Sequence, residues 1–303
     1  MSKQAVEALI KQIEATEGAV ADERVKAIVN RIVRDLFNTI DEFDVTPSEF
    51  WTALNFLGSG APEFGLIAAG LGFERLLDIR MDEAEAAAGL SPNATPRTIE
   101  GPLYVAGAPE SVGFARLCGD DEIGEPMIME GQVFSEDGVT PLANALVEVW
   151  HANHLGNYSY FDPSQSAFNL RRSIRTDENG RYCFQSVLPI GYSVPPDGAT
   201  DKILKAVGRH GNRPAHIHFF VTADGHRKLT TQINIEGDPY LWDDFAFATR
   251  DGLVTPVTKV NDAAQAAKYG IDGEFAHINF NFTLHKEAVS LFSTEVTRAR
   301  AAA

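Results

Sequence analysis

The stretch AHIHFFVT, residues 215–222, has the strict alternation of a β-strand. Successive side chains of a strand point to opposite faces of its sheet, so Ile217, Phe219 and Val221 share one face while His216 and His218 share the other. Two imidazoles on one face can reach a single metal ion, but two partly buried, hydrogen-bonded histidines are the more common reason for this pattern. The segment therefore predicts a strand and, taken alone, gives only weak evidence for a metal site.

Other short segments of β-type composition follow residue 101, separated by Gly, Pro, Asn and Asp. They are residues 127–134, 145–150, 180–185, 229–235 and 278–284. Short strands at such spacing, with no fixed-period repeat, are typical of a β-sandwich. We therefore expect the region around the two histidines to be mainly β.

The chain before this region has the apolar periodicity of helices. Apolar residues recur from Val25 to Ile40 in alternating steps of three and one, which predicts an amphipathic helix, and a shorter helix is expected over residues 6–13. The sequence TPSE at residues 46–49 has the pattern of a capping box with proline at the first helical position. Further helical segments are expected at residues 62–79 and 81–88.

These patterns divide the chain into three expected parts. Residues 1–98 form a helical N-terminal segment, residues 99–285 a β-sandwich domain, and residues 286–303 a C-terminal helix or tail. The apolar faces of the N-terminal helices either pack on the sandwich or form a subunit interface, and the pattern does not decide between these two interpretations.

Composition limits the partners and the location of the protein. The 303 residues include 42 acidic and 26 basic side chains, a formal net charge of −16 that repels nucleic acid. We see neither a targeting segment in the first 26 residues nor a membrane-spanning stretch, so we expect a cytoplasmic protein that is not a membrane protein. Cys118 and Cys183 have neither CxxC nor ligand spacing, which agrees with a reducing compartment.

The neighbours of the histidine pair supply no carboxylate. Arg213, Pro214 and His210 lie close in sequence, so a site of two histidines and one carboxylate has no local source for its third ligand.

Tyrosines are nearer to hand. Tyr192 lies in LPIGYSVPP, residues 188–196, and Tyr158 and Tyr160 lie in GNYSYFDP, residues 156–163. Both segments are rich in turn-forming residues, which predicts loops. Spacing does not choose between Tyr158 and Tyr160, and a single tyrosine is more often an apolar ring with a solvated hydroxyl.

Several motifs, taken in order, resemble the catechol 1,2-dioxygenases of the intradiol ring-cleavage family. The central ones are GRHGNRPAHIHF at residues 208–219 and DGHRKLTTQI at residues 224–233. The others are TPRTIEGPLYVAG at 95–107, VWHAN at 149–153, FNLRR at 168–172 and GDPY at 237–240. The resemblance extends from about residue 66 to residue 254 and implies an intradiol dioxygenase-like β-sandwich with a helical dimerisation segment.

This resemblance implies an oxidoreductase that cleaves catechol with O2 to cis,cis-muconate, in the β-ketoadipate pathway of aromatic catabolism. One non-haem Fe(III) per subunit is expected, with Tyr158, Tyr192, His216 and His218 as its ligands and Tyr192 and His218 as the axial pair. Tyr160 is then not a ligand. Two phenolates offset much of the ferric charge and disfavour reduction, whereas zinc prefers other donors.

The resemblance also implies roles for residues around the iron. Tyr192 is expected to act as an internal base as well as a ligand, Arg213 to stabilise developing negative charge, and Gln232 to orient a reacting group. The substrate pocket is expected to consist of Leu66, Ala69, Ile99, Pro102, Leu103, Arg213, Phe245 and Ala246.

That pocket is apolar, with no added cation to pair with a substrate carboxylate, which favours catechol over protocatechuate. Ala69 lies where relatives carry a bulkier residue, so methyl- and chlorocatechols stay open as substrates. Two alternatives remain: a hydroxyquinol or chlorocatechol dioxygenase with the same iron site, or a non-catalytic sandwich module like prealbumin, suggested by residues 130–150. By resemblance the partner is a second copy of the chain, joined through the N-terminal helices, with a phospholipid at that interface.

Overall fold

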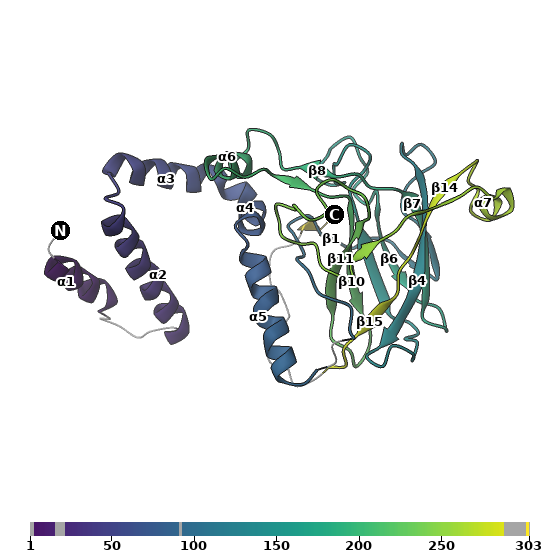
Figure 1. Cartoon of the computed structure of the whole chain (residues 1–303), viewed down its shortest axis with the longest axis horizontal. Coiled ribbons are helices and arrows are strands. Elements are labelled where there is room, and N and C mark those ends of the chain that lie inside the picture. The colour runs from purple at the N-terminus through teal and green to yellow at the C-terminus, as the bar shows by residue number, and fades with distance from the viewer. Residues whose placement is uncertain (1–2, 16–21, 91–92, 288–300, 303) are drawn as a thin grey trace. The chain divides into compact units, whose positions relative to one another are not determined.

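The computed structural model describes residues 3–15, 22–90, 93–287 and 301–302 (Figure 1). Its contacts divide the chain into two compact units, Met1–Ala61 and Pro62–Ala303. Most of the expected C-terminal helix or tail, residues 286–303, lies outside the described residues. Of its described part, Ala301–Ala302 form strand β16, which pairs in parallel with β1 (Val105–Ala106).

The first unit contains the three helices expected there: α1 (Lys3–Glu14), α2 (Glu23–Glu42) and α3 (Pro47–Gly60). The capping box of α3 is confirmed, because the Thr46 hydroxyl accepts from the Glu49 amide and the Glu49 carboxylate accepts from the Thr46 amide at 2.8 Å. The amphipathic helix α2 begins after Asp22, whose side chain accepts from the Val25 amide. The starts of α2 and α3 are thus capped by the side chains of Asp22 and Thr46.

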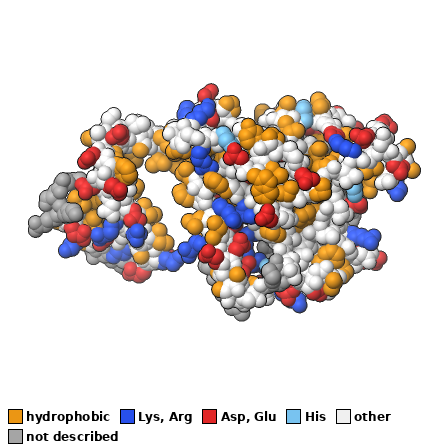
Figure 2. Space-filling model, viewed as in Figure 1, with side chains coloured by type: hydrophobic (Ala, Val, Ile, Leu, Met, Phe, Trp, Pro, Cys, Tyr) orange, Lys and Arg blue, Asp and Glu red, His pale blue; other side chains and the backbone are white. Residues whose placement is uncertain are grey.

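Helix α2 leaves its apolar stripe largely uncovered. Val25, Ile28, Val29, Ile32 and Leu36 are each 47–56% exposed, and no described residue of the helix is buried. Figure 2 shows hydrophobic side chains among the charged ones over these N-terminal helices. Contiguous apolar surface of this kind normally has a partner, so this face is a candidate interaction surface.

The helices of the second unit divide the chain differently from the expectation. The unit contains α4 (Phe64–Gly70) and α5 (Phe73–Ala87), preceded by a 3-10 turn at Ala61–Glu63. The expected helices at residues 62–79 and 81–88 are therefore wrong in their boundary: the break lies at Gly72, whose φ of 81° is left-handed, and α5 continues through residue 80. Composition does not predict this break, because the residues before and after Gly72 are equally helix-forming.

The described residues of this unit also form helices α6 (Ala199–Ala206) and α7 (Ala263–Tyr269). Helix α4 contacts both α5 and α6. Glu63 fixes the start of α6, since its carboxylate accepts from the amides of Ala199 and Thr200 at 3.0 and 2.9 Å. Among the described residues no single helix is long and apolar enough to cross a membrane, although Pro47–Gly70 and Phe73–Ala87 reach that length and composition as a bent pair.

Two β-sheets form the body of the second unit (Figure 1). Within the described residues the first has the order β12-β11-β10-β5-β6-β2 and the second the order β13-β14-β4-β7-β3, with β15 paired to β4. The strands of the first sheet are β2 (Glu110–Val112), β5 (Leu146–Trp150), β6 (Arg171–Arg175), β10 (His216–Thr222), β11 (Leu229–Ile235) and β12 (Val254–Thr255). Those of the second are β3 (Phe114–Arg116), β4 (Pro126–Ser135), β7 (Arg181–Val187), β13 (Thr258–Val260), β14 (Phe275–Asn279) and β15 (Phe282–Leu284).

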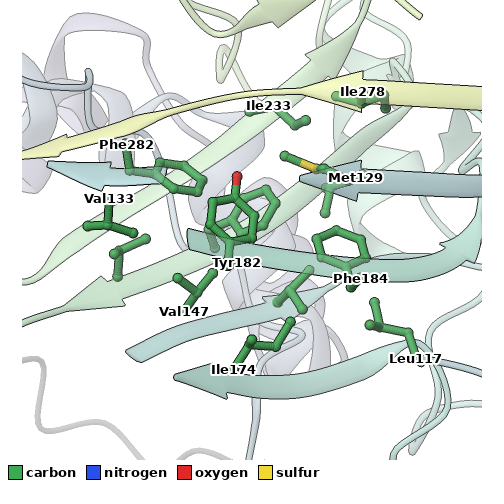
Figure 3. Close-up of a cluster of buried hydrophobic side chains, with 14 of the residues drawn as sticks. Leu117, Met129, Val133, Val147, Ile174, Tyr182, Phe184, Ile233, Ile278 and Phe282 are labelled. Atoms are coloured by element: carbon green, nitrogen blue, oxygen red, sulfur yellow. The ribbon is translucent and has the colours of Figure 1, made fainter. Parts of the chain in front are cut away.

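The two sheets enclose one apolar core (Figure 3). Met129, Tyr182 and Phe184 from the second sheet meet Val147 and Ile174 from the first, and all five are at most 1% exposed. The expected β-sandwich with an N-terminal helical segment is confirmed. It places β10 in the interior of its sheet, between β5 and β11, with both faces covered.

Most of the expected strands are present, but one expected segment is divided, and β2, β3, β6, β12 and β13 lie outside the expected segments. The segment 278–284 is two strands because the chain leaves the ladder at residue 280, where the Phe280 carbonyl accepts the Tyr182 hydroxyl and the Asn281 side chain accepts the Gln132 amide. Strand β6 was not expected, because three arginines in five residues obscure its alternation. Arg171 at its start is nevertheless 2% exposed.

Buried His151, just after β5, should make the fold sensitive to acid. Its Nδ1 donates to the Ala152 carbonyl at 2.8 Å, and in the neutral ring its Nε2 accepts from the Ser186 hydroxyl at 2.7 Å. Burial lowers its pKa from 6.5 to about 4, so between these values the unfolded chain binds the proton and the folded chain does not. Stability is therefore fully present above the unfolded pKa and is lost as pH falls, by about 1.4 kcal/mol per pH unit.

We expect His151→Gln to reduce this slope. Urea unfolding of the wild type and the variant at about pH 7 and about pH 5 should show a drop in unfolding free energy smaller by about 2 kcal/mol in the variant. Equal drops in both proteins would contradict the assignment of a neutral, buried His151.

Candidate metal centre

The two histidines of β10 point their Nε2 atoms at the same place. The His216 Nδ1 donates to the Pro214 carbonyl at 2.7 Å, which makes Nε2 the acceptor nitrogen of the neutral ring, and the two Nε2 atoms are 3.1 Å apart. Burial and the nearby Arg213 charge lower the pKa of His216 to about 3, and burial likewise holds the pKa of His218 well below its usual value. Both imidazoles are thus in the neutral form that binds metal ions.

Neighbouring strands hold these rings in place. His218 lies opposite Trp150 of β5, and the indole stacks on the imidazole with ring centroids 5.0 Å apart and planes 4° from parallel. On the other face of β10, Ile217, Phe219 and Val221 belong to the sandwich core, as the alternation predicts. The histidines are therefore fixed by the same strand that builds the core.

Two tyrosine hydroxyls reach the same place from separate segments. Tyr158, from the expected loop, has its hydroxyl 3.3 Å from the His216 Nε2, and the Tyr192 hydroxyl lies 3.3 Å from Tyr158 and 3.5 Å from that nitrogen. Tyr192 was expected on a loop but forms β8 (Tyr192–Ser193), paired with β9 (Asn212–Arg213). Tyr160, which spacing could not separate from Tyr158, is 46% exposed.

The four donors suit a hard metal ion better than zinc. Among the described residues there is no cluster of three or more His, Cys, Asp or Glu that would hold a metal without tyrosine. The donor spacings of 3.1–3.5 Å are close to the roughly 3 Å expected between neighbouring ligands that each lie about 2.0–2.2 Å from one ion. Burial raises the pKa of Tyr158, so its ionisation requires a strong positive charge beside it, which a trivalent ion supplies. The residues present thus fit ferric iron.

A buried guanidinium adjoins the donors. Arg213 is 4% exposed, and its Nη1 lies 3.0 Å from the His216 Nε2 while its Nη2 donates to the Gln232 side chain at 2.8 Å. Although burial opposes the charge, Asp244 outweighs it and keeps the pKa of Arg213 above its ordinary value. A permanent positive charge therefore faces the centre. The structure brings Arg213 and Gln232 together with the four donors.

A cavity opens beside the donors. Gly101, Tyr192, Arg213 and His218 line it together with the seven apolar residues expected for the pocket. Those seven are Leu66, Ala69, Ile99, Pro102, Leu103, Phe245 and Ala246. They come from α4, from the segment 99–103 and from the turn at 245–246, so most of the residues that line the cavity are apolar.

Sequence reasoning missed some residues that support the site. Arg171 donates through Nε to the Ser159 hydroxyl at 2.7 Å and through Nη2 to the Ser159 carbonyl at 3.1 Å, which fixes the loop next to Tyr158. Asp244, which pairs with Arg213, was also missed. Both are charged residues with no apolar periodicity around them, so the burial that makes them informative is not visible in the sequence.

Comparisons with known proteins match the chain in two segments. A family model described as Dioxygenase matches residues 99–286, and one described as Catechol dioxygenase N terminus matches residues 22–89. Catechol 1,2-dioxygenase 2 of Acinetobacter lwoffii is 68% identical over 259 residues, 85% of this chain and 94% of that protein. The crystal structure of wild-type Acinetobacter radioresistens catechol 1,2 dioxygenase has 54% identity and a TM-score of 0.95, covering 100% of this chain and 99% of the other.

The chain belongs to the catechol dioxygenase family. A relative with a different named substrate is more distant: hydroxyquinol 1,2-dioxygenase of a Rhizobium species is 35% identical over 87% of this chain and 90% of its own length. The boundary expected at residues 98 and 99 stays a prediction, since the contacts divide the chain after Ala61 while the matched segments are separated at 89 and 99.

In this catechol dioxygenase, Gly156 sets the position of Tyr192. Gly156 has a φ of 81°, and a Cβ built on it would overlap the Tyr192 Cβ. We expect Gly156→Ala to displace that tyrosine and lower kcat by about tenfold or more, because small misplacements of reacting groups have large effects. Steady-state kinetics on the iron-loaded enzyme measure the change.

Gly225→Ala is the matched control. Gly225 has a φ of 68° with nothing within 4 Å of the added Cβ, so both variants carry the same backbone penalty of about 1–2 kcal/mol. Only Gly156→Ala should lose activity; equal kcat losses in the two variants would show that backbone strain alone is responsible.

Proposed function

We propose that this enzyme cleaves catechol between its two hydroxyl-bearing carbons with O2, giving cis,cis-muconate, and that Tyr158, Tyr192, His216 and His218 hold one non-haem Fe(III) per subunit. The observation that carries this proposal is the convergence of two neutral imidazoles, the buried Tyr158 phenol and the partly buried Tyr192 phenol beside an apolar cavity. When bound, ferric iron would supply the positive charge that favours the ionised catechol and its reaction with O2.

The chain's own residues have distinct parts in this proposal. Tyr192 lines the cavity and is near enough to the other donors to accept a proton from the incoming catechol. Arg213 places its fixed charge at the cavity wall, where it stabilises negative charge that develops on the substrate. Gln232 holds the Arg213 Nη2 and thereby limits how the guanidinium can turn. The apolar wall excludes water from the reacting ring.

The lining also supports a preference for catechol. Arg213 is the one Lys or Arg among the described lining residues, and Asp244 already pairs with it, so a substrate carboxylate would find no spare partner there. We therefore expect poor turnover of protocatechuate. Comparing kcat/KM for catechol, 4-methylcatechol, 4-chlorocatechol and hydroxyquinol separates this proposal from the hydroxyquinol and chlorocatechol alternatives.

The test of the iron site is the colour and metal content of the purified protein. About one iron per chain and a red tyrosinate-to-iron absorption band are expected, together with the ultraviolet absorbance of cis,cis-muconate when catechol and O2 are added. A colourless protein with no stoichiometric iron would contradict the proposed iron site.

We further propose that the enzyme is a cytoplasmic homodimer joined through its N-terminal helices, with a phospholipid bound at that interface. The half-exposed apolar stripe of α2 supports this proposal. A monomer mass, measured by light scattering over a range of protein concentrations, would contradict the dimer. Lipid extraction followed by mass spectrometry tests whether a phospholipid is bound.

A further inference from the structure

Asp244 makes a two-pronged contact with Arg213. The Arg213 Nε donates to Asp244 Oδ1 and its Nη2 to Oδ2, each at 3.1 Å, and the two side chains are 5% and 2% exposed. Such parallel contacts fix the plane of a guanidinium as well as its location. With Nε and Nη2 engaged in this way, Nη1 is the nitrogen directed at His216.

Asp244 is itself held by the backbone of the turn that follows it. Its Oδ1 accepts from the Ala246 amide at 3.0 Å and its Oδ2 from the Ala248 amide at 3.3 Å. The Phe245 carbonyl is in turn held by Arg209 at 2.9 Å. The carboxylate therefore cannot follow a moving guanidinium, and its position is fixed before any substrate enters the cavity.

Stability alone does not account for a buried ion pair at this place. Removing two charges from water costs about as much as their attraction returns, so an apolar pair of equal volume would serve the fold as well. The pair does, however, hold the guanidinium of a residue that lines the cavity in one orientation.

We propose that Asp244 is a positioning residue for the reaction: it holds the Arg213 guanidinium in the plane from which its charge reaches the substrate. This inference rests on the proposed function, because it assumes that Arg213 acts on bound catechol. It assigns Asp244 no contact with substrate. Asp244 then affects turnover only by positioning Arg213. Such an effect can be distinguished from a purely structural one, because it disappears when Arg213 is replaced.

The experiment is a double-mutant cycle of Asp244→Asn and Arg213→Met, read as kcat on the iron-loaded enzyme. In the wild-type background we expect Asp244→Asn to lower kcat by about 10- to 100-fold, since a loosened Arg213 loses much of its effect. In the Arg213→Met background the same substitution should change kcat by less than about threefold. Equal factors in both backgrounds would overturn the proposal.

Controls separate the other causes of lost activity. Iron content and the visible band should be retained in Asp244→Asn, because none of the four metal donors is replaced. Asp78→Asn removes another buried carboxylate, which pairs with Arg250 at 2.8 Å and does not line the cavity, so it should lower stability without lowering kcat. If Asp244→Asn does not fold, Asp244→Glu, which keeps the charge, is read in the same cycle. A wild-type protein without iron or catechol turnover would reject the proposed function, whereas an active enzyme with an additive cycle rejects only the role of Asp244.

Discussion

Tyr192→Phe is expected to lower kcat by about 10²- to 10⁴-fold, the range associated with losing a general base. The substitution removes one hydroxyl and almost no volume, from a residue that lines the cavity and lies 3.3 Å from the Tyr158 hydroxyl. Because the same oxygen is proposed as an iron ligand, the visible band should weaken and shift in the same variant. Stopped-flow kinetics and the absorption spectrum measure the two effects on one sample.

Tyr160→Phe provides the matched control for this result. It makes the same chemical change two residues from Tyr158, on a side chain that is 46% exposed. Its spectrum and kcat should equal those of the wild type. If Tyr192→Phe left the kinetics unchanged, Tyr192 would not be the internal base. If it left the spectrum unchanged, Tyr192 would not be an iron ligand.

Arg213→Met is the second substitution with a large expected effect. Loss of a fixed charge aimed at developing negative charge typically lowers kcat by about 10²- to 10³-fold. Apolar contacts in the cavity still hold the ring, so KM should change much less than kcat. Initial rates over a range of catechol concentrations separate the two constants.

Stability must be followed in the same variant, because Arg213→Met leaves Asp244 buried without its partner. An uncompensated buried charge costs about 3–5 kcal/mol. Adding Asp244→Asn should recover much of this loss, measured by urea unfolding, without recovering kcat. If the double variant regained activity, the lost turnover would reflect instability and not the missing charge.

The sequence predicted the centre of the fold well because one strand carries a simple signal. In β10 every second residue faces the sandwich core, so alternation alone separates Phe219 from His218. Helix α2 and the capping box of α3 were predicted equally well, since periodicity and capping are local properties of the sequence. The break at Gly72 was not predicted, because nothing in the flanking composition distinguishes a glycine of left-handed conformation from one inside a helix.

The candidate site was less accessible to such reasoning. Tyr158 and Tyr192 approach His216 from 58 and 24 residues away, and only the resemblance to known dioxygenases singled them out. Asp244 lies 31 residues from Arg213, in a short acidic sequence. The sequence did not predict its role, because a buried aspartate cannot be distinguished from an exposed one by sequence alone. Tertiary contacts between charged residues carry no periodic signal.

The separation between the proposed metal donors and the apolar wall has a consequence for how such an enzyme can change. The two histidines belong to a strand packed on both faces, so variation there is costly. Leu66, Ala69 and Phe245 belong to a short helix and a turn, where side chains can be exchanged without disturbing the sheet. Under selection or laboratory evolution for new aromatic substrates, substitutions should therefore occur mainly in those two segments. They should change which substituted rings the enzyme accepts and leave the chemistry of the reaction unaltered.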